Sequence, residues 1–445
     1  MEEVKRYLSF EDLLKDKAEN HPEKTAFIYD YEGIKELSYK DFFDAVSKRK
    51  EELLLSNKTA EGIVCEASIS CLTEIMAANS AGLQITLLPK EKDEVIQKLA
   101  EATDCDLIWG SNIEVNKGVK NGKGNILFFT SGTTSFSKAV VLTDESLCSS
   151  AYNGSCMLKL DENDKLMCLL PLNHVFGFVC SFLWGFTNTC PVILNRGARH
   201  YIDDLSYFKP TAVSLVPLLV GFFVKNNLFN EELKTVLVGA GDCPDILMKA
   251  VQSKGIHLSF GYGLTETSSG VAISTKGDLR AMEICPDNKI SIAEDGEIII
   301  ENHTCMMKGY YKDDESTKSV LQNNILKTGD LGYLDEECKL HINGRKKEIL
   351  VLNDGTKIFL PEYEANLSNK LGNNELCVLL KDNSLTLVIK TEENIGKIRE
   401  LSDEVTKDLP RSQKIKDIII LDKDLPRNAA GKLIRWQIEK ELNHD

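Results

Sequence analysis

The sequence predicts an α/β fold, with a large N-terminal domain of layered sheets and a small α+β C-terminal domain. Between residues 61 and 110, and again from 126 to 344, short apolar runs alternate with helical stretches, as in sheets covered by helices. The alternation ends at a short charged link that begins at Gly344. We therefore expect a domain of residues 1–344, a short link of residues 345–347, which would be the hinge, and a small second domain of residues 348–445.

Individual elements follow from local patterns. Phe10 opens an amphipathic helix, Thr25 begins a short strand, and Ser38 is placed as the N-cap of a second helix. Later strand candidates are residues 166–170, 211–216, 235–238 and 258–260, small antiparallel strands at 296–301 and 338–342, and C-terminal strands at 376–380, 385–389 and 417–421.

Composition excludes several classes of protein. The 445 residues carry a net charge of −15, which argues against a nucleic-acid binder or a binder of anionic membranes. We see no secretory signal at the start, and polar residues and prolines interrupt the most apolar region, residues 167–194, so no integral membrane segment is expected. The 13 cysteines, without C-x-x-C pairs, are typical of reduced thiols in a cytoplasmic protein without a zinc site.

The stretch from Ile126 to Thr143 is an apolar run, a hydroxyl-rich turn and a second apolar run. Such a loop can direct backbone N–H groups, hydroxyls and an ammonium at a phosphate chain, although it does not match the common P-loop. A Ser/Thr-rich surface hairpin turn is the alternative. The candidate phosphate ligands are Thr130, Ser131, Gly132, Thr133, Thr134 and Lys138.

Two further patterns suggest the walls of a cleft. His174, in Pro171-Leu172-Asn173-His174-Val175-Phe176-Gly177, could orient a carboxylate or gate a tunnel, whereas a lone histidine is more often an ordinary core residue. Gly239, Ala240 and Gly241 follow a strand, and such small residues let a flat base approach the backbone. An ordinary strand-to-helix turn explains the second pattern as well.

The segment Tyr262-Gly263-Leu264-Thr265-Glu266 is more specific. Tyr262 offers a ring to stack on adenine, Thr265 a hydroxyl to a phosphate, and Glu266 a hard oxygen to Mg²⁺. Further on, Asp330 in a Thr-Gly-Asp triplet could accept both ribose hydroxyls, and Arg345 could supply a second ribose or phosphate contact.

These motifs, in this order, resemble those of the acyl-adenylate-forming (AMP-binding, ANL) superfamily, and most closely those of acyl-CoA synthetases. The resemblance covers residues 8 to 438 and includes a terminal Pro-x-x-x-x-Gly-Lys-x-x-Arg motif that contains Lys432. The chain departs from the family at Ser135, Ser137 and Ala139, where glycines and a proline are usual. Less glycine should stiffen the loop and puts the turnover rate in question. Asp242 and Cys243 also depart from the usual Ala-Pro.

The resemblance implies a small barrel-like β part in the first domain and a reaction in two halves. A carboxylate attacks the α-phosphorus of Mg·ATP to give acyl-AMP and pyrophosphate, and a thiol, CoA or phosphopantetheine, then displaces AMP. Lys432 would steady the transition state, Glu266 would hold the metal, and His174 would act on the acid. The C-terminal domain would swing about Lys347 between the halves.

The acid is expected to be apolar. Peptide-synthetase domains place an Asp near the histidine motif to meet an ammonium, and this chain has none there, so a fatty or aromatic acid is favoured and fatty acid metabolism is a candidate context. Three hypotheses remain open. They are an acyl-CoA ligase, an acyl-AMP ligase that loads a carrier protein, and a catalytically weak acyl- or nucleotide-binding relative.

Overall fold

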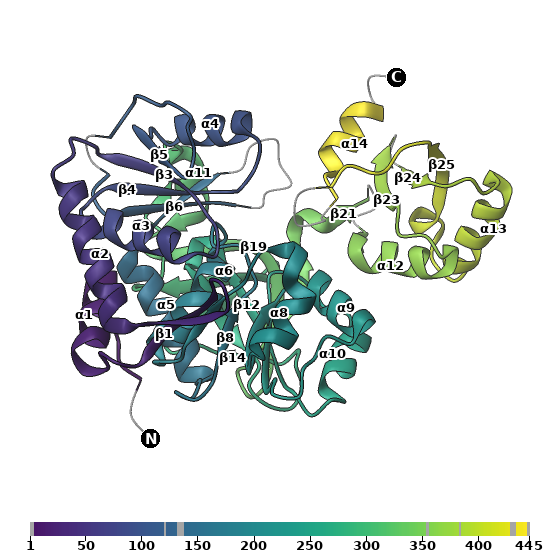
Figure 1. The fold of residues 1–445 in the computed structure, drawn as a ribbon. Coiled ribbons are helices and arrows are strands. Elements are labelled where there is room, and N and C mark those ends of the chain that lie inside the picture. The colour runs from purple at the N-terminus through teal and green to yellow at the C-terminus, as the bar shows by residue number, and fades with distance from the viewer. Residues whose placement is uncertain are drawn as a thin grey trace.

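The protein is described here from a computed structural model that covers residues 4–119, 122–130, 138–352, 356–381, 384–427 and 433–442. Within these ranges the chain forms sheets flanked by helices, with the C-terminal elements gathered to one side of the larger part (Figure 1). The N-terminal helices are α1 (Phe10–Asn20), α2 (Tyr39–Leu54), α3 (Ile69–Ser80), α4 (Asp93–Ala102) and α5 (Asp144–Met157). Ser9, Ser38 and Ser68 cap α1, α2 and α3 by accepting a backbone N–H bond on their side-chain oxygens.

The first sheet of the described chain has nine strands and is parallel in its centre. Its order is β14 (Glu283–Ile284), β13 (Ser269–Ile273), β12 (His257–Leu264), β11 (Thr235–Val238), β10 (Ala212–Leu215), β8 (Leu166–Cys168), β9 (Val192–Leu194), β1 (Thr25–Asp30) and β2 (Ile34–Ser38). Its helices are α6 (Val175–Phe178), α7 (Trp184–Thr187), α8 (Tyr201–Phe208), α9 (Pro217–Asn226) and α10 (Asp245–Gln252). A π-helical turn, Val179–Leu183, joins α6 to α7.

The second sheet carries the hairpin that holds the predicted phosphate loop. Its order is β17 (Gly309–Tyr310), β7 (Ala139–Thr143), β6 (Asn125–Phe129), β4 (Gln84–Leu88), β3 (Ala60–Val64) and β5 (Leu107–Trp109). Strands β6 and β7 pair antiparallel, while β3, β4, β5 and β6 are mutually parallel. The loop therefore emerges at the C-terminal end of β6, at the edge where parallel α/β sheets bind ligands.

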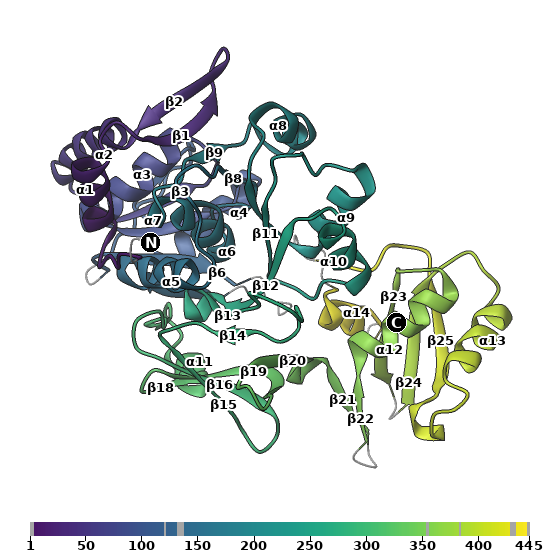
Figure 2. The ribbon, with the colours of Figure 1, turned by 90° about the horizontal axis from the view of Figure 1, so that it is seen from below.

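The third sheet is antiparallel and small, and it lies where a small barrel-like β part of the first domain is expected. It contains β15 (Asn288–Ile292), β16 (Glu297–Asn302), β18 (Leu321–Gln322), β19 (Ile325–Leu334) and β20 (Leu340–Arg345), with helix α11 (Asp314–Val320) before β18. Beyond β20 a 3-10 turn, Lys346–Glu348, leads into β21 (Ile349–Val351) and β22 (Lys357–Phe359), which Figure 2 shows beside the C-terminal elements.

The C-terminal elements are β23 (Leu376–Lys381), β24 (Ser384–Lys390), β25 (Ile415–Leu421), α12 (Leu360–Leu371), α13 (Ile395–Val405) and α14 (Arg435–Leu442). Their buried apolar side chains form clusters of their own, such as Leu367, Val378 and Leu387 on one side of the sheet and Cys377, Val388 and Ile438 on the other. The predicted layered α/β fold is confirmed, whereas the exact division at residues 345–347 stays a prediction.

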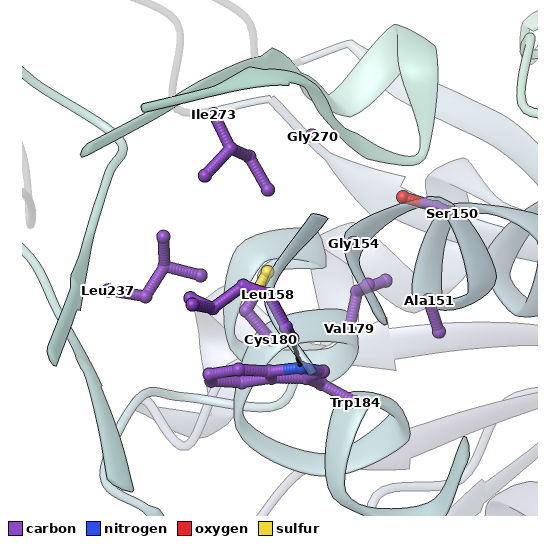
Figure 3. A pocket seen from close by; sticks show the side chains of 10 residues that line it. All are labelled: Ser150, Ala151, Gly154, Leu158, Val179, Cys180, Trp184, Leu237, Gly270 and Ile273. Atoms are coloured by element: carbon purple, nitrogen blue, oxygen red, sulfur yellow. Dashed lines mark hydrogen bonds between the residues drawn. The ribbon is translucent and has the colours of Figure 1, made fainter. Parts of the chain in front are cut away.

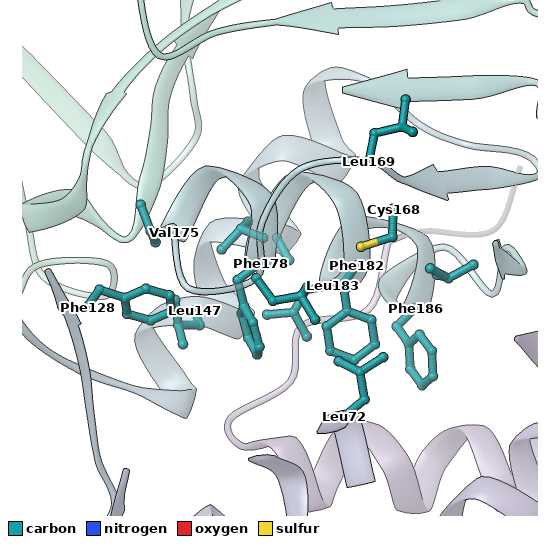
Figure 4. Close-up of a cluster of buried hydrophobic side chains, with 14 of the residues drawn as sticks. Leu72, Phe128, Leu147, Cys168, Leu169, Val175, Phe178, Phe182, Leu183 and Phe186 are labelled. Atoms are coloured by element: carbon teal, nitrogen blue, oxygen red, sulfur yellow. The ribbon is translucent and has the colours of Figure 1, made fainter. Parts of the chain in front are cut away.

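A row of phenylalanines links the second sheet to the helix that follows His174 (Figure 4). Phe128 of β6 packs on Phe178 at a ring-centroid distance of 5.9 Å, Phe178 on Phe182 at 5.5 Å, and Phe182 on Phe186 at 4.9 Å. Each such pair adds about 0.5–1.5 kcal/mol beyond simple burial. The row fixes the hairpin of the phosphate loop relative to the histidine motif. No helix in the described ranges is both long and apolar enough to cross a membrane.

Candidate active site

Asp330 and Tyr262 form one end of the candidate site. Asp330 lies on β19 with only 3% of its surface exposed, and it faces Arg345 of β20 as a direct strand partner. Its Oδ1 lies 2.9 Å from the Nε of Arg345, and its Oδ2 accepts a 2.8 Å hydrogen bond from the Tyr262 hydroxyl. Burial and the neighbouring carboxylate raise the pKa of Tyr262 well above its usual value, so Tyr262 stays a donor. Three residues singled out in the sequence thus meet.

Gly263 gives the turn after Tyr262 its shape. Gly263 pairs with Gly270 across a β-bulge between β12 and β13, and a Cβ atom at Gly263 would lie 1.8 Å from the carbonyl oxygen of Ser269. Only glycine fits so close an approach of two backbones. The bulge then leads into a 3-10 turn, Thr265–Thr267, which places the partly exposed Thr265 and Glu266 beyond the Tyr262 end.

The turn after β11, residues 239–241, has room only for small side chains at its first position. A Cβ atom at Gly239 would lie 2.9 Å from the ring of Phe176, and Ala240 adopts a left-handed conformation with φ of +61°. Gly241 lies close to the ring of Pro217. The missing side chain at Gly239 therefore makes room for the Phe176 ring, and the predicted role of Gly239 toward a flat base stays a prediction.

Arg280 was not anticipated from the sequence, and it supplies a partner for Asp242, one of the two departures from the family pattern. Its guanidinium bonds the carboxylate of Asp242, the carbonyl oxygen of Cys243 at 2.8 Å and Asp245 Oδ1 at 3.0 Å. The acidic turn is thus stabilised by one cation. The signal in the sequence for a nearby cation was the presence of two acidic residues, Asp242 and Asp245, close together at the start of a helix.

The two ends of the phosphate loop are held together. The backbone N–H of Thr130 donates to the carbonyl of Lys138 at 2.9 Å, and the N–H of Lys138 donates to the Thr130 hydroxyl at 3.2 Å. Ser131, Gly132, Thr133 and Thr134, the other predicted phosphate ligands, lie outside the described residues, as do the departures Ser135 and Ser137. The roles of all these residues stay predictions.

Glu266 and Lys138 meet at Tyr310, a residue that the sequence analysis missed. The Tyr310 hydroxyl donates a 2.8 Å hydrogen bond to Glu266 Oε1, and the Lys138 ammonium lies 4.4 Å from the centre of the Tyr310 ring. No described residue hydrogen-bonds Glu266 Oε2. A carboxylate with one oriented and one available oxygen fits a hard cation such as Mg²⁺. The only signal in the sequence was a tyrosine directly after Gly309.

His174 precedes α6 at its N-cap position and keeps contact with solvent. Nearby protein atoms desolvate it enough to lower its pKa, so the ring is neutral near pH 7. Gly177 holds the turn, because a Cβ atom there would lie 2.2 Å from the carbonyl oxygen of Pro171. Neither observation tests the predicted role of His174 toward an acid.

A small apolar cavity of about 20 Å³ lies behind these motifs (Figure 3). Leu237 of β11 precedes Gly239 by two residues, Gly270 is the strand partner of Gly263, and Cys180 follows Phe176 by one helical turn. The other lining residues are Ser150, Ala151, Gly154, Leu158, Val179, Trp184 and Ile273. No described residue hydrogen-bonds the buried Ser150 hydroxyl, and Figure 3 shows its oxygen directed toward the enclosed space. The π-helical turn, a feature often found at functional sites, forms one wall.

Lys432 lies outside the described residues, and only the flanks of its motif can be placed. Arg435 forms a two-pronged pair with Glu364 at 2.6 Å, and Arg427 bonds Glu375 at 3.1 Å. Both arginines are therefore tied to elements of the C-terminal part. The predicted role of Lys432 remains untested.

The fold and the site together define the class of adenylate-forming enzymes. The features are the layered sheets, the β6–β7 hairpin whose ends are hydrogen-bonded, and the buried Asp330 carboxylate beside Tyr262. A family model for AMP-binding enzymes matches residues 54–311. The chain belongs to this family, as the resemblance predicted, and the predicted class of AMP-forming acid–thiol ligases is confirmed.

Known relatives cover most of the chain. It is 30% identical to the 2-succinylbenzoate–CoA ligase of Oceanobacillus iheyensis over 71% of this chain and 69% of that protein. It is 25% identical to the Bacillus subtilis 2-succinylbenzoate–CoA ligase over 96% and 97% of the two chains. Among solved structures, the Bacillus subtilis o-succinylbenzoate CoA synthetase in complex with the acyl-adenylate intermediate superimposes with a TM-score of 0.80 at 22% identity, covering 96% and 97% of the chains. This structural similarity supports the assignment of the fold.

Proposed function

We propose that this protein activates an aromatic carboxylic acid with ATP and transfers the acyl group to CoA. One observation carries the proposal. The short segment from Tyr262 to Glu266 contacts Asp330 at one end and, at the other, Tyr310, whose ring lies under Lys138. A nucleoside bound at the first end would extend its phosphates toward the second.

In the first half-reaction, a carboxylate oxygen of the acid bonds to the α-phosphorus of ATP and pyrophosphate leaves. Asp330 accepts hydrogen bonds from the ribose hydroxyls, Tyr262 and Gly239 enclose the adenine, and Lys138 neutralises phosphate charge. Mg²⁺, when bound through Glu266, screens the negative charge of the phosphates. Lys432 stabilises the charge that develops on phosphorus.

In the second half-reaction, the CoA sulfur bonds to the acyl carbon, the thiol proton is lost and AMP leaves. We propose that the C-terminal part, residues 348–445, turns about Lys347 between the two halves. The short 3-10 link between β20 and β21 and the separate apolar clusters beyond it are consistent with such a motion.

The acid is proposed to be aromatic, with a neutral far end. The cavity of about 20 Å³ has room for about one water molecule, so an aromatic acid would enter it only as the cavity opens. Its ten lining residues include no cationic side chain, so a second carboxylate placed there would be buried without a partner. The Ser150 hydroxyl suits a small neutral substituent that forms hydrogen bonds. A second candidate is 2-succinylbenzoate, because the relatives quoted above are named for it. Fatty acid metabolism has no support in those names.

The test is an ATP/pyrophosphate exchange screen with benzoates, 2-succinylbenzoate, fatty acids and amino acids. We expect exchange with aryl monocarboxylic acids, and exchange with 2-succinylbenzoate alone would establish the second candidate. No exchange with any acid, despite ATP binding, would favour a catalytically weak relative. CoA and a phosphopantetheine-bearing carrier protein are then compared as acceptors. The cytoplasmic location stays a proposal from cysteine usage.

A further inference from the structure

We propose that Tyr310 is a positioning residue that holds the metal-binding carboxylate of Glu266 and the phosphate-binding ammonium of Lys138 apart and aimed at the same nucleotide. The inference rests on the proposed function but concerns a residue that no part of the motif analysis singled out. Its two contacts are the 2.8 Å hydrogen bond to Glu266 Oε1 and the 4.4 Å approach of Lys138 to the ring.

The backbone around Tyr310 is anchored on both sides of the site. Tyr310 pairs with Val140 of β7, directly beside the end of the phosphate loop, and its N–H donates to the Thr317 hydroxyl at 2.8 Å. A few residues earlier, the N–H of Met307 donates to the carbonyl oxygen of Glu266 at 2.8 Å. One short segment is thus bonded to both the phosphate-loop strand and the metal-binding turn, so its tyrosine has little freedom to move.

The chemistry of the arrangement explains why a tyrosine is suited to this place. An ammonium and a carboxylate in one cleft tend to form a direct ion pair, which would consume the charges that the nucleotide and its metal need. Lys138 makes no ion pair within the described part of the chain. The aromatic face attracts the ammonium while the hydroxyl takes one carboxylate oxygen, so both groups are satisfied without neutralising each other.

The experiment compares three variants by calorimetric binding of Mg·ATP, metal-free ATP and AMP. Tyr310→Phe removes the bond to Glu266 but keeps the ring under Lys138, and Tyr310→Leu removes both contacts. Tyr311→Phe is the matched control. Tyr311 is the next residue along the chain, and its hydroxyl donates an equally short 2.8 Å hydrogen bond to Asp104, away from Glu266 and Lys138. Binding of AMP, which lacks the outer phosphates, reports whether the nucleoside end is intact.

We expect Tyr310→Phe to weaken Mg·ATP binding about 10-fold. Loss of a hydrogen bond to a metal-binding carboxylate typically weakens metal binding about 10- to 100-fold, and we take the lower value. Its binding of metal-free ATP and AMP should stay near that of the unmodified protein. Tyr310→Leu should weaken metal-free ATP as well, and Tyr311→Phe should change none of the three. The Mg²⁺ concentration for half-maximal exchange should rise in Tyr310→Phe.

The results separate the inference from the proposed function. If the unmodified protein binds neither Mg·ATP nor AMP, the proposed function fails. If it binds both and Tyr310→Phe behaves like Tyr311→Phe toward Mg·ATP, Tyr310 has no positioning role. Equal weakening of Mg·ATP, metal-free ATP and AMP in Tyr310→Phe would indicate a general structural role and would also overturn the inference.

Discussion

Asp330 and Arg345 lie opposite each other on neighbouring antiparallel strands, and the Arg345 Nε lies 2.9 Å from the Asp330 Oδ1. The strand pairing brings together two residues that are 15 positions apart in the sequence. The Tyr262 hydroxyl completes the group from the first sheet. The nucleoside end of the proposed site is therefore built where two sheets meet, before any ligand binds.

Asp330→Asn should weaken AMP binding by about 10- to 100-fold. The variant keeps the shape of the side chain but removes the charge that would bind both ribose hydroxyls, and a hydrogen bond to a charged group is worth about 1.5–3 kcal/mol. Calorimetric titration with AMP measures the effect. Asp335→Asn is the control, because Asp335 follows β19 and bonds His341 at 2.9 Å. Unchanged AMP affinity in Asp330→Asn would remove Asp330 from the nucleotide site.

Lys432→Ala should reduce acid-dependent pyrophosphate exchange by about 100-fold or more, because loss of a single group that stabilises developing charge has effects of that size. Thioester formation from supplied acyl-AMP should be spared, since Lys432 is proposed to leave the site before that step. Lys440→Ala, an exposed lysine of α14, is the control. Equal losses in both half-reactions would contradict a swinging C-terminal domain.

Local pattern predicted the strands well because buried parallel strands are continuous apolar runs, and residues 235–238 coincide with β11. The sequence also singled out Tyr262, Asp330 and Arg345, which lie in contact in the structure, and their roles stay predictions. Tyr310 could not be found in this way, because its partner Glu266 is 44 residues away and β17 reaches it only by pairing with β7. Arg280 and the π-helical turn depend likewise on long-range packing.

Gly263→Ala should destabilise the protein by about 1–3 kcal/mol or more, because the added Cβ would lie 1.8 Å from a backbone oxygen that cannot move away freely. Thermal unfolding should show a lower Tm, and AMP binding should weaken as Tyr262 shifts. Gly270→Ala is a close control, since Gly270 is the strand partner of Gly263 and an added Cβ there has no neighbour within 4 Å. Similar Tm values for the two variants would refute the steric argument.

Glu61→Gln should stabilise the protein at pH 8 but not at pH 5. Glu61 on β3 is fully buried beside Glu74, and Glu74 is paired with Arg49 at 2.7 and 2.9 Å. Burial and the negative charge of Glu74 raise the pKa of Glu61 from 4.5 to about 9. The folded chain thus holds a proton that the unfolded chain releases above pH 4.5, so the free energy of unfolding falls as pH rises toward 9.

The neutral glutamine has no proton to lose, so the variant should escape this pH-dependent loss and gain at least about 1 kcal/mol at pH 8. Urea unfolding of both proteins at pH 5 and pH 8 measures the difference. Glu74→Gln is the contrasting variant, and it should destabilise at both pH values because the Arg49 guanidinium loses its charged partner. A stability change in Glu61→Gln that is the same at both pH values would show that Glu61 is already ionised in the folded protein.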